Sequence, residues 1–515
     1  MAEGIDKRDW TAAVEKFTRL HENHALDSSQ KRYRELIPAP PEAGQQYAFE
    51  VDLDKCTGCK ACVTACHNEN GLDEDETWRS VGLIQGGTSE NPVMQHVTAA
   101  CHHCAEPACM TGCPTKAYVK DVETGIVKHL EDQCFGCQYC ILKCPYDVPK
   151  YSKKRGIVHK CDMCIGRLQV GQPPACVRAC PNGAIRITLV DTREVKKKFE
   201  GFVNVPDAPR SDYTYPTTRY KTKRQWPQNT TSLDYLQLKP EHSHLPLVFM
   251  LVLTQLSVGT VLAELVLKEF VSLSVSGPLS LTHRWVALAT GLLALGVSVL
   301  HLGRPLYAFR AVLGFKTSWL SREIVAFGLF AFCAVIYAWK ANDVLNTMNY
   351  IVFLSGFIGI LCSVMVYRDT KRPFWDNDMT TVKFLMTMCI LGLATGLLIS
   401  ARSLGRAFCG WIIFFSFAKM LLESIVFFSL RAADDHFFKK TAILMTRPLK
   451  KITVWRFALG AAGGIVLPGL MMFNNFYALP ASFFSLALLL GGELLERYLF
   501  FRAVVSLPML ARQVK

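Results

Sequence analysis

The chain has 515 residues, half of them hydrophobic, with a net charge of +14 and a mean hydropathy of +0.19. This length allows two or three domains, and the hydropathy is high for a purely soluble enzyme. Much of the excess Lys and Arg lies in short loops between apolar runs, which is typical of membrane proteins rather than of nucleic-acid-binding proteins. We therefore expect no nucleic-acid partner.

Changes in composition along the chain predict four regions. Residues 1–47 form a polar extension, in which residues 8–20 have the spacing of a surface helix or of an arm that docks on a partner. Residues 48–190 contain 16 of the 20 cysteines, and the strand-like runs FEVDLD and IRITLV lie near the two ends. Residues 191–243, rich in Pro and aromatics without a period, predict an extended linker that lies on another surface. Residues 244–515 alternate between long apolar runs and short basic loops.

The 16 cysteines fall into four groups of four, and each group ends in C-x3-C. A proline follows the last cysteine in three of the groups, as in CFGCQYCILKCP. Converging C-x2-C-x2-C cysteines with a fourth that serves a neighbouring cluster are typical of [4Fe–4S] proteins. Zinc knuckles are one alternative and disulfides another, but four C-x3-C endings are rare in zinc sites and cytoplasmic thiols stay reduced. The four groups are Cys56, Cys59, Cys62 and Cys66; Cys101, Cys104, Cys109 and Cys113; Cys134, Cys137, Cys140 and Cys144; Cys161, Cys164, Cys176 and Cys180.

Eight apolar segments after residue 244 are long enough to span a bilayer. An even number of spans places both chain ends on one side, where the loops carry 15 Lys and Arg residues against 5 on the other. The positive-inside rule therefore predicts a multi-pass protein of the inner (cytoplasmic) membrane, with the cysteine-rich region and both termini in the cytoplasm. The first 20 residues contain acids and no apolar run, so we expect no Sec or twin-arginine leader there. The segments are 246–267, 281–301, 323–339, 348–367, 382–400, 408–430, 453–473 and 481–501.

Three ionisable residues near span ends are candidates for a quinone site. His301 and Arg304 lie in HLGRPLYAFRA, and Glu323 lies in SWLSREI, all on the side of the cysteine-rich region. A quinone needs a hydrogen-bond donor for its carbonyl and a titratable group for its protons, and His301 and Glu323 suit these two roles. The alternative is a helix-capping histidine with an ion pair of Arg304 or Arg322 to Glu323. These residues alone leave both interpretations open.

The cysteine-rich half resembles the electron-transfer subunit of the dimethyl sulfoxide reductase group of molybdopterin enzymes, in CTGCKAC, CHHCAEPAC, CFGCQYCILKCPY and the long gap of the fourth motif. The resemblance implies that the first motif shares clusters with the fourth, and the second with the third. His102 and His103, inside the second motif, would then support the ligands rather than bind iron. The implied ligand sets are Cys56/Cys59/Cys62/Cys180, Cys66/Cys161/Cys164/Cys176, Cys101/Cys104/Cys109/Cys144 and Cys113/Cys134/Cys137/Cys140.

The membrane half resembles the anchor subunit of the same group, in HLGRP…SWLSREI, PLVFMLVLTQLSVG and GELLERYLF. In that family the matching histidine and glutamate belong to the menaquinol site. The resemblance thus implies a quinone site with His301, Glu323, Arg304 and Gln255. It also implies that two subunits, usually separate, are fused here. No pair of in-span histidines suggests bis-histidine haem, so we expect none.

These observations predict an α+β ferredoxin-like domain with four [4Fe–4S] clusters, followed by an all-α membrane domain of eight transmembrane helices. We expect electrons to pass between a separate molybdopterin-containing catalytic subunit and the membrane quinone pool, menaquinone or ubiquinone. The chain could serve a quinol-oxidising reductase of the dimethyl sulfoxide or polysulfide type, or a quinone-reducing sulfite dehydrogenase. A third hypothesis is an ion-translocating or scaffold module without a quinone site. Ionisable residues that cluster mostly near one face of the membrane argue against it.

Overall fold

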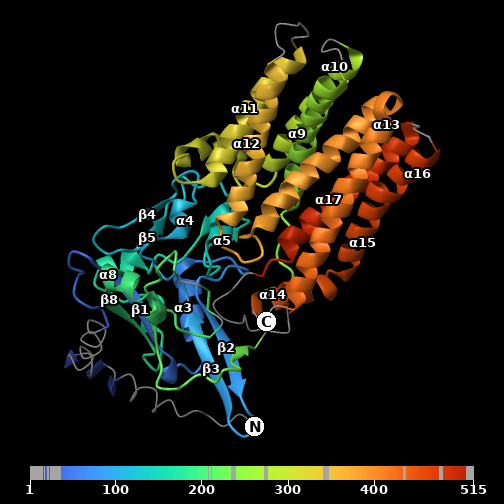
Figure 1. Cartoon of the computed structure of the whole chain (residues 1–515). Helices are drawn as coiled ribbons and strands as arrows, with labels where there is room; N and C mark the ends of the chain where they lie inside the picture. The colour runs from blue at the N-terminus through green and yellow to red at the C-terminus, as the bar shows by residue number, and fades with distance from the viewer. Residues whose placement is uncertain are drawn as a thin grey trace, which may run out of the picture.

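Strands and short helices form one part of the molecule, and long helices form the other (Figure 1). Most of the helix predicted at residues 8–20 lies outside the described residues. Its predicted role as an arm that docks on a partner therefore stays a prediction. The computed structural model describes residues 15–16, 18–19, 22–23, 36–206, 208–209, 212–233, 239–271, 277–339, 347–432, 436–474 and 479–505.

The first sheet joins the two ends of the cysteine-rich region. Strand β1 (Gln45–Asp52) contains the run FEVD and pairs antiparallel with β8 (Ile185–Asp191), which contains IRITLV. The register runs from Gln45 opposite Asp191 to Val51 opposite Ile185. The antiparallel pairing places the segment that follows β1 next to the segment that precedes β8. The first and last cysteine motifs therefore meet, although they are far apart in sequence.

The segment predicted as a linker adds one strand to each of two sheets. Strand β9 (Arg219–Lys221) lies parallel to β1, and Tyr220 within it is buried. Strand β10 (Thr231–Ser232) pairs with β2 (Ser80–Gly87), which pairs in turn with β3 (Pro92–Ala99). The segment also contains the short helices Thr192–Lys197 and Phe199–Gly201, so it is not extended throughout, and its two strands are built into the first part of the molecule.

Short elements separate and follow the cysteine motifs. Each of these elements except α3 is only one or two turns or a few residues long. They are short because the chain must return repeatedly to the thiol sites. They are η1 (Leu53–Lys55), α3 (Ala61–Asn70), α4 (Ala108–Thr111), the hairpin β4 (Tyr118–Lys120) and β5 (Val127–His129), α5 (Tyr139–Lys143), the hairpin β6 (Lys150–Ser152) and β7 (Ile157–His159), α6 (Ile165–Gln169), α7 (Ala175–Arg178), α8 (Thr192–Lys197) and η2 (Phe199–Gly201).

Among the residues that the structure describes, eight helical segments are long and apolar enough to cross a membrane, as predicted. The segment α13 contains two of these spans and folds back on itself, since Lys419 contacts Thr387, 32 residues earlier. The elements of this half are α9 (Leu245–Val271), α10 (Pro278–Val299), η3 (Pro305–Gly314), α11 (Trp319–Trp339), α12 (Met348–Arg368), α13 (Asp378–Ala432), α14 (His436–Thr446), α15 (Lys450–Ala461), the π-helical turn η5 (Ala462–Val466), α16 (Leu467–Asn474) and α17 (Leu479–Arg502).

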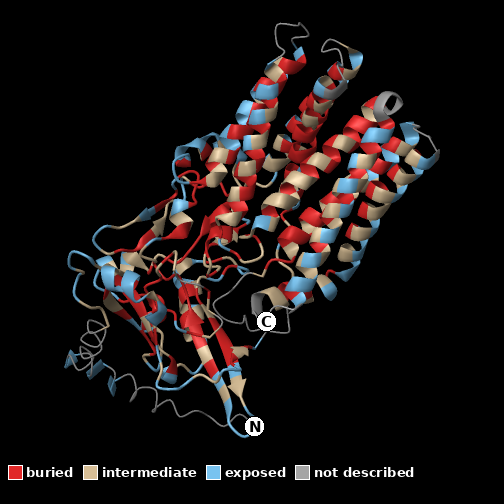
Figure 2. Cartoon of the chain, in the orientation of Figure 1, coloured by how far each residue is buried: buried red, intermediate tan, exposed pale blue. Residues whose placement is uncertain are grey.

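Burial in the membrane half follows the helix faces (Figure 2). Buried residues line the space between the helices, while large apolar side chains such as Phe332 and Phe473 are exposed on the outside. Such outer faces match contact with lipid tails, which exert no pressure to hide apolar groups. The largest apolar cluster joins the two parts, because Tyr139 and Leu142 of α5 belong to it with residues of α9, α11 and α12.

Candidate functional site

Two cysteine loops share one backbone shape. In CTGCKAC, Gly58 (φ 73°) and Lys60 (φ 61°) adopt left-handed conformations, and in CFGCQYC, Gly136 (φ 74°) and Gln138 (φ 61°) do the same. The two reversals curl the chain so that three thiols face one point, and a helix begins directly afterwards. Glycine suits the first reversal because it adopts positive φ without strain.

The structure brings together the four thiols of each set that the resemblance implied. Burial raises the pKa of one thiol in each set (Cys56, Cys104, Cys140 and Cys161), and the neighbouring charges of the other three members raise it further. We name each site after its first cysteine. They are the Cys56 site (with Cys59, Cys62 and Cys180), the Cys66 site (with Cys161, Cys164 and Cys176), the Cys101 site (with Cys104, Cys109 and Cys144) and the Cys113 site (with Cys134, Cys137 and Cys140).

Two of the thiol sites line small cavities. One cavity lies among the thiols of the Cys101 site and the other among those of the Cys56 site. Within the described residues, no three His, Cys, Asp or Glu side chains are grouped to hold a single metal ion. In a zinc site the thiolates lie only ~4 Å apart, given Zn–S bonds of ~2.3 Å. The residues present therefore fit a cluster better than zinc.

Backbone amides near the thiols supply the hydrogen bonds that a cluster needs. The amide of Ala117 donates to Cys113 Sγ at 3.3 Å, and the amide of Ala184 donates to Cys180 Sγ at 3.2 Å. Amide bonds to cysteine sulfur help to set the reduction potential of iron–sulfur clusters. These donors lie just after the C-x3-C-P endings, where the proline turns the chain.

Buried polar side chains lie between successive sites. Tyr118 is close to thiols of both the Cys113 and the Cys101 sites. Lys160 Nζ lies 3.7 Å from Cys101 Sγ and donates at 2.7 Å to the carbonyl of Cys161, a member of the Cys66 site. Arg79, only 2% exposed, lies near thiols of both the Cys66 and the Cys56 sites. The four sites thus form a row, in the order Cys113, Cys101, Cys66 and Cys56.

The two histidines of the second motif are buried and held by polar contacts. His102 Nδ1 lies 2.8 Å from Thr218 Oγ1, and its ring meets the edge of Tyr146. His103 Nδ1 accepts a hydrogen bond from the Val127 amide at 3.1 Å. Burial and, to a lesser extent, the charge of Arg79 lower the pKa of His102 to about 3. A neutral, hydrogen-bonded ring fits the supporting role that the resemblance implied.

The Cys113 site lies against the membrane helices through three glycines. A Cβ on Gly136 would lie 2.3 Å from the carbonyl oxygen of Gly156, and a Cβ on Gly303 would lie 2.0 Å from the same atom. Gly303 belongs to the loop HLGRP, directly after the second span. The amide of Arg304 donates to the Phe135 carbonyl at 3.0 Å, and its guanidinium donates to the Glu131 carbonyl at 3.0 Å. Arg304 thus fastens the loop to the cysteine domain.

His301 faces both the Cys113 site and the segment that precedes α9. Its imidazole hydrogen-bonds the backbone of Cys137, and its ring lies 5.1 Å from that of His244, edge to face. Burial and, to a lesser extent, the charge of His242 lower the pKa of His301 to about 4, although the bond to Cys137 acts in the opposite direction. His301 is therefore a neutral imidazole at physiological pH.

Glu323 is buried at the cluster-side end of α11. Ser363 of α12 donates a hydrogen bond to its carboxyl group, and Tyr139 of the third cysteine motif lies close by. The Arg304 or Arg322 ion pair that the sequence left open is not among the contacts of the described residues. Arg322 instead donates to the carbonyls of Phe315 and Lys316. Both His301 and Glu323 therefore lie beside the loop that carries Cys137 and Tyr139.

Gln255 lies one step further into the helices. Its Oε1 accepts a hydrogen bond from Arg497 Nη2 of α17 at 3.3 Å. Tyr367 lies near both Arg497 and Glu323, and so links the two. No described contact joins Gln255 directly to His301 or Glu323.

The expectation that ionisable residues gather near one membrane face is wrong. Glu264, near the far end of α9, accepts hydrogen bonds from Tyr337 at 2.8 Å and Ser280, and contacts Lys268 at 3.0 Å. A second buried set joins α13, α15 and α17 around Lys419 and Glu493. Folding created these groups from residues scattered over many turns. Their sequence signal was nevertheless visible as charges inside apolar runs, such as AKMLLES and GGELLER.

Comparison with known families identifies the family of the membrane half. Residues 240–502 match the family described as DMSO reductase anchor subunit (DmsC). The chain therefore belongs to this family. Residues 92–189 of the same chain match a 4Fe-4S dicluster domain, and residues 47–68 a 4Fe-4S binding domain. This DMSO reductase anchor subunit family member thus carries its own iron–sulfur domain, in front of the anchor.

Relatives of the iron–sulfur half are separate subunits. The B subunit of the anaerobic dimethyl sulfoxide reductase of Haemophilus influenzae is 35% identical over 189 residues, which are 35% of this chain and 91% of the relative. The B subunit of the Escherichia coli enzyme is 36% identical over 179 residues, 33% of this chain and 86% of the relative. The iron-sulfur subunit of the nitrate-inducible formate dehydrogenase of Escherichia coli is 33% identical over 191 residues, 32% of this chain and 65% of the relative. The family member is thus a fusion of an iron–sulfur subunit and an anchor subunit, and a multi-pass membrane protein.

Proposed function

We propose that this chain conducts electrons between a molybdopterin-containing catalytic subunit and membrane quinone, through four [4Fe–4S] clusters. The row of four thiol sites supports this proposal most strongly. Its first member contacts the membrane loop of His301, and its last contains Cys59, which is exposed. An exposed site at the far end is where a partner subunit could deliver or collect electrons. Each cluster would accept and pass on one electron at a time.

The geometry around His301 supports a quinone site at the inner end of this row. One ring nitrogen of His301 donates to the Cys137 backbone, which leaves the other, unprotonated in the neutral ring, to accept a hydrogen bond from a quinol hydroxyl. Glu323 is buried and has a hydroxyl partner rather than a cationic one, so it can exchange a proton with the quinone. Arg304 holds the loop in place and does not reach toward Glu323. We retain Gln255 as a member of the wider site through Arg497 and Tyr367.

The sidedness of the membrane half favours a cytoplasmic catalytic partner. Loops and adjoining span ends on the cluster side carry the larger number of Lys and Arg residues, 15 against 5. A cytoplasmic partner suits a quinone-reducing dehydrogenase, such as one that oxidises sulfite. The names of two of the relatives point instead to a reductase, and the name of the third points to a dehydrogenase. The electron path is the same in both cases and only its direction differs.

The proposal is tested by quinone reoxidation of the reduced clusters. The purified chain in detergent is reduced, mixed with a menaquinone analogue, and followed by EPR. We expect four [4Fe–4S] centres that the analogue reoxidises, and we expect His301→Ala to slow reoxidation at least tenfold with unchanged spectra. Stoichiometric zinc without a paramagnetic signal would overturn the cluster assignment. Reoxidation at the wild-type rate in His301→Ala would remove this residue from the site.

A further inference from the structure

A set of buried charges joins helices α13, α15 and α17 inside the membrane half. Lys419 Nζ donates to the carboxylate of Glu493 and, at 2.6 Å, to the hydroxyl of Thr387. Arg456 Nη2 bridges two carboxylates, at 3.0 Å to Glu423 and 3.1 Å to Glu493. All these side chains are less than a tenth exposed. Charges in the membrane interior are costly and are functional candidates by default.

The set continues toward the cluster side of the membrane. Lys383 Nζ lies 3.4 Å from Glu496, and its side chain is 16% exposed. Arg497 Nη2 lies 3.5 Å from the same carboxylate and donates to Gln255. Tyr367, buried in an aromatic cluster, lies within electrostatic range of both Arg497 and Glu323 of the proposed quinone site. The charge set thus extends to the neighbourhood of the place where quinone protons would be exchanged.

Polar groups also continue toward the far side. Ser416 lies one helical turn before Lys419 and packs against Gly464, in the π-helical turn η5. Pro468, four residues later, has no amide hydrogen to donate to the Gly464 carbonyl, which explains the irregular turn there. Ser485 of α17 donates to the Gly463 carbonyl at 2.6 Å. Ser482, near the start of α17, is also buried. We call this set of side chains the polar column; it comprises Gln255, Lys383, Thr387, Ser416, Lys419, Glu423, Arg456, Ser482, Ser485, Glu493, Glu496 and Arg497.

The polar column has more hydrogen-bonding capacity than its own residues use. Within the described residues, Gln255 Nε2, Arg497 Nε and Nη1, and Ser416 Oγ are buried without a hydrogen-bond partner. Unsatisfied polar atoms of this kind are normally bonded to internal water. Gly460 and Gly492 leave room for the Arg456 guanidinium. A Cβ on Gly460 would lie 2.8 Å from Arg456 Nη1, and a Cβ on Gly492 would lie 3.3 Å from the same atom. Helix–helix adhesion alone requires neither the spare donors nor this room.

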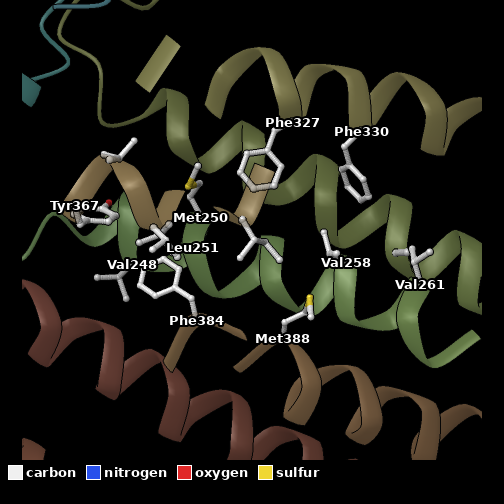
Figure 3. Packing of buried hydrophobic residues seen from close by; sticks show 14 of the residues in the cluster. Val248, Met250, Leu251, Val258, Val261, Phe327, Phe330, Tyr367, Phe384 and Met388 are labelled. Atoms are coloured by element: carbon white, nitrogen blue, oxygen red, sulfur yellow. The ribbon is translucent and has the colours of Figure 1, made fainter. Parts of the chain in front are cut away.

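The neighbouring helix bundle provides a contrast. The buried face of α11 bears Glu323 at one end and Tyr337 at the other, 14 residues or about 21 Å apart along the helix. Between them lie Phe327 and Phe330, which point into an apolar interior with Val258 and Val261 (Figure 3). The Glu264 set at the far end is therefore separated from Glu323 by apolar packing. The Glu264 set therefore has the same kinds of buried charged groups as the polar column, but no polar groups among the described residues join it to the proposed quinone site.

We propose that the polar column carries protons between the far side of the membrane and the quinone site. Quinone reduction takes up two electrons, delivered through the clusters, and two protons to give quinol. With the column as the proton source, these protons come from the side opposite the clusters, so that electron transfer moves charge across the membrane. The inference rests on the proposed quinone function.

The test uses the full chain in sealed vesicles that contain menaquinone and an internal pH-sensitive dye. A membrane-impermeant viologen radical reduces only those molecules whose clusters face outward. We expect the internal pH to rise in proportion to quinone reduced. Glu493→Gln should lower the number of internal protons consumed per quinone at least tenfold. Glu264→Gln, a matched neutralisation of a buried carboxylate outside the column, should leave this ratio unchanged.

Each outcome separates the two proposals. Quinone reduction without an internal pH change in the wild type would overturn the column and leave the quinone site intact. A wild-type ratio in a correctly folded Glu493→Gln, judged by elution profile and cluster EPR, would also overturn it. If that variant does not fold, Ser416→Ala decides, because this hydroxyl has no hydrogen bond to lose; it should lower the ratio at least threefold, and an unchanged ratio overturns the column. Absence of quinone reduction in the wild type would instead contradict the proposed function.

Discussion

The imidazole of His301 hydrogen-bonds the backbone of Cys137. One residue lies directly after a membrane span, and the other is in the cysteine motif that faces the membrane. The residue that we propose to contact a quinone is thus one residue contact away from the nearest thiol site. Electron transfer over so short a distance does not require a separate carrier between the two parts.

The depressed pKa of His301, about 4, predicts a simple pH dependence. The neutral ring persists above about pH 4, so binding of a quinone analogue should stay constant from pH 8 to about 5.5 and weaken toward pH 4. Because the folded pKa lies below the ordinary value of ~6.5, the stability contributed by the neutral ring is lost as pH falls from about 6.5 toward 4. Fluorescence titration of an analogue across this range measures the effect. Weakening centred near pH 6.5 would contradict the buried environment.

The contact of Gly303 with Gly156 predicts a strong effect of one methyl group. Gly303→Ala should push the His301 loop from the Cys113 site, because a Cβ would lie 2.0 Å from the Gly156 carbonyl oxygen. We expect quinone reoxidation of the clusters to slow at least tenfold, with unchanged cluster spectra. Gly296→Ala in the same span is the matched control, since nothing lies within 4 Å of its Cβ position. Equal rates in the two variants would show that this contact is unimportant.

Membership of the thiol sites can be tested with double variants. Cys101→Ser and Cys144→Ser should each damage the same cluster, so the double variant should lose no more EPR signal than either single one. Cys140→Ser with Cys144→Ser should damage two clusters, although these residues lie in one motif. Cys333→Ala, a buried cysteine of α11, serves as the control and should retain all centres. Loss of two clusters in the first pair would contradict the assignment.

Arg79 is expected to raise the potentials of the two sites between which it lies. A reduced cluster is more negative than an oxidised one, so a buried cation favours reduction. Arg79→Gln should lower the potentials of the Cys56 and Cys66 sites by on the order of 100 mV, taking an effective dielectric constant of about 20 and several ångströms of separation. Arg79→Lys should keep most of the effect. EPR-monitored redox titration measures it, and a uniform shift of all four centres would argue for general loosening instead.

The predicted topology can be tested independently of any electron transfer. A reporter fused after Lys515 should be active in the cytoplasm, because the loops of the cluster side carry the excess of Lys and Arg. A second fusion in the loop between α11 and α12 should report the opposite side. Periplasmic activity of the first fusion would reverse the orientation and remove the support for a cytoplasmic partner.

Much of the fold and the site could be predicted because their signals are local. Apolar length alone predicted the eight spans, and C-x2-C-x2-C with C-x3-C-P predicted iron–sulfur binding. Charges at span ends drew attention to His301 and Glu323. The error concerned charges deeper in the spans: Lys419 and Glu493 are 74 residues apart. Nothing in the sequence around either residue indicates that the two side chains meet.

The sequence by itself determined which chemistry this protein can hold: thiols at cluster spacing, apolar spans, and a histidine and a glutamate at the edge of the membrane. The family resemblance implied which thiols meet, and the folded structure shows that they do and in what order the four sites lie. The antiparallel pairing of β1 with β8 brings Cys180 to the Cys56 site, and the glycine contact at Gly303 selects the Cys113 site as the inner end. Both depend on long-range approach of backbones. A small residue such as glycine permits two backbone segments to approach closely, but only the folded chain shows which two segments do so.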